Sequence, residues 1–136
     1  MPTVFTSHSK HILLADDDED DCFLFKNALE ELSIPFILTT VYNGEELMEW
    51  LRTPERQLPE ILFLDLNMPR KNGFECLLEI RSDNKFDQLP VIVFSSAYAP
   101  EVIELLYKGG AHYYVRKPDG LEQYRKVIYH SLHLRH

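Results

Sequence analysis

The chain has little of what a membrane protein or a disulfide-stabilised secreted domain requires. No apolar run approaches the ~20 residues of a membrane span, and the polar segment Met1–Lys10 is too short for a signal peptide. The two cysteines, Cys22 and Cys76, fall inside helical patterns rather than at framework spacing. We therefore expect a cytoplasmic protein with reduced thiols; a redox pair is the alternative interpretation of the cysteines.

Basic residues are also in the minority. The 136 residues include 22 acidic and 14 basic side chains, which gives a formal net charge of -8. A nucleic-acid-binding protein needs a basic surface that replaces phosphate counterions, so this balance argues against that class. It suits a protein that gathers carboxylates around a hard cation. The length is that of one ordinary domain, and an apolar fraction of 45% is normal for a packed core.

Short apolar runs alternate with segments of helical periodicity along the whole chain. The runs are His11–Ala15, Phe36–Val41, Ile61–Leu64, Val91–Phe94 and Tyr113–Val115, and the last helix is expected over Leu121–Leu134. Strands that are apolar on both faces and separated by helices indicate a parallel sheet covered on both sides. With right-handed crossovers, the pattern predicts a doubly wound, flavodoxin-like α/β domain with a five-stranded parallel sheet.

Polar side chains follow all but the second of these runs. They are Asp16, Asp17 and Asp18 after the first run, Asp65 and Asn67 after the third, Ser95 and Ser96 after the fourth, and Arg116, Lys117 and Pro118 after the fifth. In a doubly wound sheet, ligands bind outside the carboxyl ends of the strands, so these groups should meet at one edge. Glu19, Asp20 and Asp21, in contrast, are interpreted as a solvated helix start.

The converging carboxylates fit a divalent-metal site. Crowded carboxylates repel one another and raise each other's pKa values unless a cation is present. Mg²⁺ prefers oxygen ligands and binds through one or two carboxylates together with a substrate phosphate. We expect Asp16 and Asp17 to hold the ion, with an oxygen of Asp65 and the backbone carbonyl of Asn67 as further ligands.

The same group of residues fits phosphoryl transfer. A carboxylate such as that of Asp65 can attack phosphorus and form an aspartyl-phosphate. The reaction needs mainly in-line positioning and neutralisation of charge on the phosphoryl oxygens. Mg²⁺ and Lys117 can neutralise that charge, and a hydroxyl after the fourth run can donate a hydrogen bond. Ser95 and Ser96 are both candidates for this hydroxyl, because alternation does not separate them in a strand buried on both faces.

At these residues the sequence resembles the receiver domains of two-component response regulators. The matching stretches are ADD at 15–17, FLDLNMPRKNG at 63–73, FSSA at 94–97 and YVRKP at 114–118. They cover essentially the whole chain in order. The stretch DLNMPRKNGFECL looks most like the single-domain regulators that partner phytochrome-type histidine kinases. The resemblance implies a short polar tail over residues 1–9, a receiver domain over 10–136 and no separate output domain.

The resemblance also implies roles for individual residues. Asp65 becomes the phosphoacceptor, and Asp16 and Asp17 become the acidic metal-binding pair. Ser96, which Ala97 follows, takes the family's conserved-hydroxyl position, and on this ground we choose it over its neighbour.

Further positions follow from the same comparison. Lys117 takes the place of the family's invariant lysine, and Tyr114 takes the aromatic switch position three residues before it. Asn67 and Tyr98 fall at positions that tune the lifetime of the phosphate. Asp119 stands where an aromatic side chain often follows the Lys-Pro pair, which alters the surface near the partner site.

Together these features predict a non-enzymatic signalling switch. A sensor histidine kinase or phosphotransfer protein supplies the phosphoryl group to Asp65, with Mg²⁺ as cofactor. The phosphate then draws Ser96 toward it, and Tyr114 turns inward. This reshapes the face made by the fourth helix, fifth strand and fifth helix, which contacts a downstream protein or a second copy of the chain. No nucleic-acid or membrane partner is expected.

Two other classes remain open at this point. A Mg²⁺-dependent phosphohydrolase of the haloacid-dehalogenase kind also uses an Asp nucleophile on a doubly wound sheet. Asp16 and Asp18 formally fit its D-x-D pair, although the chain lacks a cap insertion. A phosphorylation-independent binding module would keep the receiver fold for its surface alone. It predicts lost acidic or lysine positions, and all of them are present here.

Overall fold

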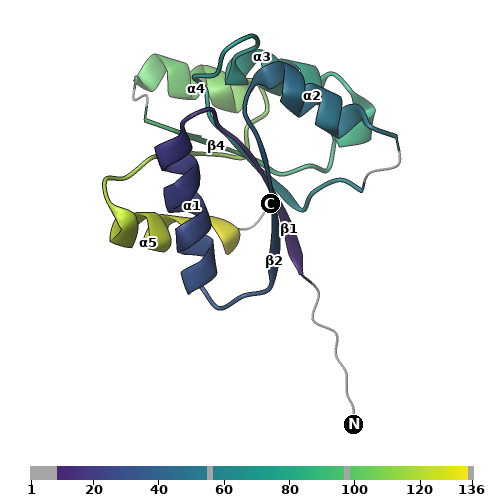
Figure 1. Cartoon of the computed structure of the whole chain (residues 1–136). Coiled ribbons are helices and arrows are strands. Elements are labelled where there is room, and N and C mark those ends of the chain that lie inside the picture. Colours follow the sequence, from purple (N-terminus) through teal and green to yellow (C-terminus); the bar gives the residue numbers. More distant parts are fainter. Residues whose placement is uncertain (1–8, 55–56, 97–98, 135–136) are drawn as a thin grey trace.

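The computed structural model describes residues 9–54, 57–96 and 99–134, and these form one parallel sheet with helices on both faces (Figure 1). The strands are β1 (Lys10–Ala15), β2 (Phe36–Val41), β3 (Ile61–Leu64), β4 (Val91–Ser95) and β5 (Tyr113–Arg116). All neighbouring strands pair in parallel, in the order β2-β1-β3-β4-β5. This is the flavodoxin-like order, so the predicted fold is confirmed.

The helices divide between the two faces of the sheet. They are α1 (Glu19–Glu31), α2 (Gly44–Arg52), α3 (Gly73–Arg81), α4 (Pro100–Lys108) and α5 (Leu121–Leu132), with a 3-10 turn over Asn84–Phe86. Figure 1 shows α1 and α5 on one side, and α2, α3 and α4 on the other. The last helix ends at Leu132, two residues before the predicted end. Among the described residues, no helix is long and apolar enough to cross a membrane.

Each face of the sheet has its own apolar core, because successive side chains of a strand point to opposite faces. On β1, Leu13 packs with the α2–α4 layer and Leu14 with the α1–α5 layer. The second layer contains edge-to-face aromatic pairs, with ring centroids 4.9 Å apart for Phe25 and Phe63 and 5.6 Å apart for Phe94 and Tyr124. Tyr124 of α5 is thus anchored in the core behind the carboxyl ends of the strands.

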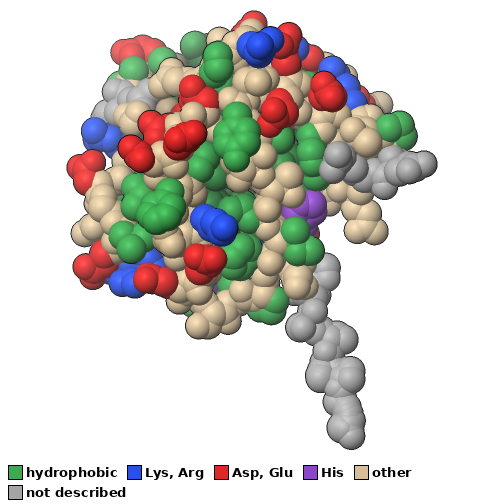
Figure 2. Space-filling view, in the orientation of Figure 1, with side chains coloured by type: hydrophobic (Ala, Val, Ile, Leu, Met, Phe, Trp, Pro, Cys, Tyr) green, Lys and Arg blue, Asp and Glu red, His purple; other side chains and the backbone are tan. Residues whose placement is uncertain are grey.

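The cysteines belong to these two layers. Cys22 lies on α1, Cys76 is buried on α3, and both are free. Burial raises the pKa of each thiol to about 12, which keeps it protonated at neutral pH. The prediction of reduced thiols that lean into the core is confirmed. Outside the core, Figure 2 shows acidic side chains spread over the visible face, with apolar side chains exposed between them.

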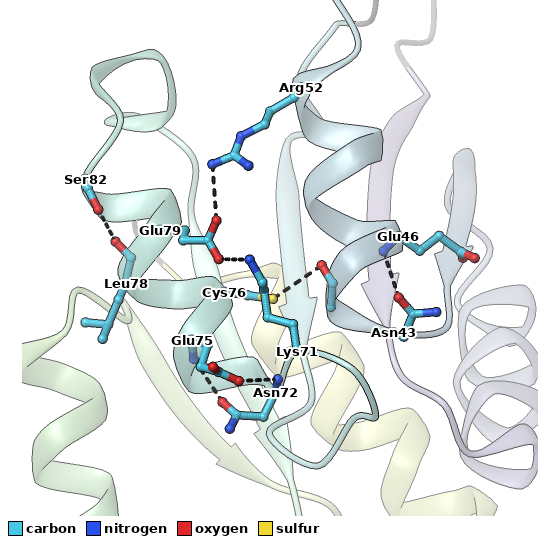
Figure 3. Close-up of polar contacts among 11 residues, drawn as sticks. Asn43, Glu46, Arg52, Lys71, Asn72, Glu75, Cys76, Leu78, Glu79 and Ser82 are labelled. Carbon is cyan, nitrogen blue, oxygen red and sulfur yellow. Dashed lines mark hydrogen bonds and ion pairs between the residues drawn. The ribbon is translucent and has the colours of Figure 1, made fainter.

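The segment that follows β3 is fixed to α2 and α3 by polar contacts (Figure 3). Asn72 caps α3 in a capping box, in which its side chain accepts from the Glu75 backbone and the Glu75 side chain accepts from the Asn72 backbone. Lys71 forms an ion pair with Glu79, and Arg52 of α2 reaches the same carboxylate at 3.3 Å. These contacts hold the loop beside the end of β3 in one place.

Gly73, the first residue of α3, packs directly on the end of β3. A Cβ atom there would lie 2.2 Å from the Asp65 carbonyl oxygen and 2.9 Å from Leu66 Cα. Because backbone atoms must move to admit it, we expect Gly73→Ala to lower the free energy of unfolding by ~2–3 kcal/mol in urea denaturation. Gly109→Ala is the matched control, since its nearest atoms would be 3.3 and 3.4 Å away. Equal stabilities of the two variants would contradict the close approach.

Candidate functional site

The carboxyl ends of β1 and β3 bring three carboxylates together. Asp16 and Asp65 are buried, with 1% and 5% of their surface exposed, while Asp17 is exposed. One ligand oxygen from each of the three lies within 4.8 Å of the others, in the one such cluster found among the described residues. Two buried carboxylates and one that faces solvent fit a hard divalent cation, which takes oxygen ligands and keeps several waters. The predicted metal-binding group is therefore assembled, and ligation by the Asn67 carbonyl stays a prediction.

Lys117, one residue beyond β5, brings a cation to this cluster. Its Nζ lies 2.8 Å from Asp16 Oδ2, 2.8 Å from Asp21 Oδ2 and 3.6 Å from Asp65 Oδ2. Only 7% of the side chain is exposed. Burial disfavours the ammonium, but the hydrogen bonds to Asp16 and Asp21 outweigh it and raise the pKa of Lys117. The predicted cation therefore lies in the site and stays charged at neutral pH.

Asp21 is a member of the site that the sequence reasoning missed. Besides its contact with Lys117, it accepts a hydrogen bond at Oδ1 from the Tyr124 hydroxyl, at 3.1 Å. The interpretation of Asp21 as part of a solvated helix start is therefore wrong, although its neighbours Glu19 and Asp20 are exposed as expected. The helical period offered a signal, because Asp21 lies one turn before the buried Phe25, on the core side of α1.

The buried carboxylates hold their protons more tightly than free ones. Burial raises the pKa of Asp65 to about 6; Lys117 and hydrogen bonds from Ser95 and the Asn67 backbone oppose this shift. Burial also raises the pKa of Asp16, against the stabilising contact with Lys117. A cation bound among these oxygens would stabilise the ionised forms of Asp16 and Asp65, so the electrostatics of the site favour cation binding.

Ser95, not Ser96, is the hydroxyl that reaches the acceptor. β4 runs one residue further than expected, and Ser95 pairs there with Arg116 of β5. Ser95 is fully buried and its side chain hydrogen bonds to Asp65. Ser96, the next residue along the chain, is exposed and lines a hollow of about 390 Å³ beside Lys117. The preference for Ser96 is corrected on this point of geometry.

Tyr114 already packs partly against the core, rather than pointing away from it. Its hydroxyl donates to the Ser95 carbonyl oxygen at 3.4 Å, and its backbone N–H donates to the Tyr107 hydroxyl of α4 at 3.0 Å. We expected the Tyr114 side chain to turn inward on phosphorylation, but in this structure it already lies inward. Tyr98, which was predicted to tune the lifetime of the phosphate, and Ala97 lie outside the described residues.

The family comparison agrees with this geometry. The sequence model of the response regulator receiver domain matches residues 12–129. A probable C4-dicarboxylate response regulator, DctR of Bacillus subtilis, is 32% identical over 86% of this chain, which spans half of that protein's length.

Two solved structures share the fold and much of the length. The phosphorylated cyanobacterial phytochrome response regulator RcpA has a TM-score of 0.84 and 32% identity, covering 89% of both chains. The Mn²⁺-bound form of response regulator Rcp1, a Synechocystis protein, has a TM-score of 0.81 and 27% identity, covering 88% of both chains. The fold of these neighbours matches the fold that the sequence predicted.

The raised pKa of Asp65 makes stability depend on pH. The folded state binds this proton more tightly than the unfolded chain, whose value is near 3.8, so the stabilisation from this group is present below pH ~4 and is lost as pH rises through about 6. At pH 7.5 in EDTA, Asp65→Asn should be more stable than wild type by ~1–3 kcal/mol in urea denaturation. The difference should vanish near pH 4.

Asp20→Asn is the control for this comparison, because it removes an exposed carboxylate. It should change the free energy of unfolding by less than ~0.5 kcal/mol at either pH. If Asp65→Asn were no more stable than wild type at pH 7.5, ionised Asp65 would not destabilise the folded state, which would contradict the raised pKa.

Proposed function

The chain belongs to the response regulator receiver domain family, and from this premise we propose that it accepts a phosphoryl group on Asp65 and signals by a phosphorylation-dependent change of surface. The observation that carries the proposal is the environment of Asp65. It is a buried carboxylate with a hydroxyl donor, a backbone donor and an ammonium beside it, and with two further carboxylates within reach of a shared cation.

The residues of the site have separable roles in this reaction. A carboxylate oxygen of Asp65 attacks the phosphorus of a phosphohistidine, the P–N bond breaks, and the donor imidazole leaves. Lys117 lies 3.6 Å from the acceptor oxygen and supplies positive charge for the phosphoryl oxygens. Ser95 hydrogen bonds to Asp65, so its hydroxyl lies where it can donate to the product. Asp16, Asp17, Asp65 and the Asn67 carbonyl would hold Mg²⁺, which supplies further neutralisation of phosphoryl charge.

The donor and the readers of the phosphate are proposed from the family and the surface. The phosphoryl source is a sensor histidine kinase or a phosphotransfer protein, and the resemblance to phytochrome response regulators favours a phytochrome-type kinase. We place the receiver domain at residues 10–136, in the cytoplasm, where it acts as a switch rather than an enzyme. Asn67 and Tyr98 tune the lifetime of the phosphate.

The output surface is α4, β5 and α5. Leu105 and Tyr107 of α4 are 52% and 46% exposed, which is high for large apolar side chains. β5 is an edge strand, and Tyr107 contacts its backbone at Tyr114. A downstream protein or a second copy would bind here, and a shift of Ser95 on phosphorylation would reach this face through the Tyr114 hydroxyl.

The rival phosphohydrolase has less support. In a D-x-D pair Asp18 would need a free carboxylate, but its Oδ1 caps α1 by accepting from the Asp21 backbone at 3.0 Å. Its backbone N–H in turn donates to Asp16 Oδ1 at 3.0 Å. Both members of the pair are thus engaged in holding the loop and the helix start. A binding module that ignores phosphate would not require the assembled cluster at all.

The proposed acceptor can be tested by chemical labelling. Incubation with acetyl phosphate and Mg²⁺ should add one phosphate that is stable in acid and labile in base, because an acyl phosphate is hydrolysed rapidly by hydroxide. Asp65→Asn should carry none, and EDTA should prevent labelling of the wild type. Intact-protein mass spectrometry measures each case, and normal labelling of Asp65→Asn would contradict the proposal.

The two serines provide a second, matched test. Ser95→Ala removes the hydroxyl that contacts Asp65, and we expect the rate of phosphorylation by acetyl phosphate to fall by about 10- to 100-fold. Ser96→Ala removes an exposed hydroxyl one residue away and should change that rate by less than about 3-fold. The reverse order of effects would return the role to Ser96. Circular dichroism and urea denaturation establish that both variants are folded.

A further inference from the structure

Three residues from separate parts of the chain form a hydrogen-bonded group beside the acceptor. Asp21 of α1 accepts from Lys117 Nζ at 2.8 Å through Oδ2 and from the Tyr124 hydroxyl of α5 at 3.1 Å through Oδ1. The Lys117 side chain is 7% exposed and Tyr124 is 1% exposed. The Asp21 side chain itself is 28% exposed. The group, called here the Asp21 triad, therefore links the phosphoryl site to the α1–α5 layer through contacts that are partly shielded from water.

Lys117 is engaged mainly with carboxylates other than the acceptor. Its two distances of 2.8 Å, to Asp16 and Asp21, are those of charge-assisted hydrogen bonds, whereas 3.6 Å to Asp65 is beyond that range. Asp16 also belongs to the metal cluster, so a bound cation would share its oxygens with Lys117. Asp21 is not part of the metal cluster, and its hydrogen bond with the Lys117 ammonium opposes any movement of Lys117 toward Asp65.

A phosphoryl group on Asp65 changes this balance. It brings a charge of roughly -1.5 to -2 close to the Lys117 ammonium, which already lies 3.6 Å from Asp65 Oδ2. Lys117 can move toward the new oxygens only as its contact with Asp21 weakens. Asp21 then loses the partner that fixes its carboxylate, and the Tyr124 hydroxyl, on a ring buried in the core, loses a fixed acceptor.

We propose that Asp21 is a positioning residue that holds Lys117 back from Asp65 and transmits its release to α5 through Tyr124. The inference rests on the proposed function and adds a second path to it. Phosphorylation would be read at the α1–α5 layer as well as at the face that contains Tyr114. Asp21 touches neither the phosphoryl group nor the metal cluster in this account, and its effect is exerted entirely through Lys117 and Tyr124.

The direction of the effect distinguishes this role from a structural one. If Asp21 restrains Lys117, Asp21→Asn should bind a phosphoryl mimic more tightly, because a neutral amide holds the ammonium less strongly. A residue that only supported the site would give weaker binding when replaced. Calorimetric titration of the full-length Mg²⁺-loaded protein with beryllofluoride measures the affinity directly.

We expect Asp21→Asn to bind beryllofluoride about 5-fold more tightly than wild type. Asp20→Asn is the matched control, since it removes the same charge from an exposed residue next to Asp21, and it should differ from wild type by less than about 2-fold. Asp21→Glu, which restores the carboxylate, should return the affinity toward the wild-type value. Unchanged or weaker binding by Asp21→Asn, or equal tightening by Asp20→Asn, would overturn the inference.

The path to α5 has its own readout in backbone hydrogen exchange. In the wild type, beryllofluoride should speed exchange in α5 around Tyr124. In Tyr124→Phe, which keeps the ring and removes the hydroxyl, α5 should exchange at the faster rate already and should not respond. A wild-type response in Tyr124→Phe would overturn this part. If wild-type protein did not bind beryllofluoride at all, the proposed function would fail, and the inference with it.

Discussion

The site depends on one buried ammonium. Lys117 is the cation that the structure places among Asp16, Asp21 and Asp65, all drawn together at the carboxyl edge of the sheet. The buried carboxylates of Asp16 and Asp65 and the partly exposed Asp21 would repel one another, and the charged forms of the buried pair would be costly without Lys117. Even with Lys117 present, burial raises the pKa of Asp65 to about 6. Lys117 thus neutralises only part of the negative charge of the cluster, and a divalent cation would neutralise more of it.

The fold supplies the rigidity that this arrangement needs. The parallel register ends β1, β3, β4 and β5 at one edge, and two separate apolar cores fix the sheet from both sides. Gly73 lets α3 begin against the Asp65 backbone, and the capped loop before it is tied to α3 by the ion pair of Lys71 with Glu79. The site is therefore built on strand ends rather than on mobile segments, so a small shift of one side chain has a defined consequence for its neighbours.

Much of this followed from the sequence, because strand ends in a doubly wound sheet converge whatever the details of packing. The fold and the meeting of Asp16, Asp17, Asp65 and Lys117 needed only apolar periodicity and that rule. Ser95 was passed over because the choice rested on Ala97, which follows Ser96, and the apolar pattern alone did not show that β4 continues to Ser95. Asp21 was missed because its partner lies 96 residues away and only the packed helices bring them together.

The central claim is that Asp65, and no other carboxylate of the cluster, becomes the acyl phosphate. Borohydride reduces an aspartyl-phosphate to homoserine, which marks the acceptor permanently. Peptide mass spectrometry after phosphorylation and reduction should find homoserine at position 65, with Asp16, Asp17 and Asp21 unchanged. Homoserine at position 16 or 17, or phosphate recovered on a histidine instead, would contradict the account.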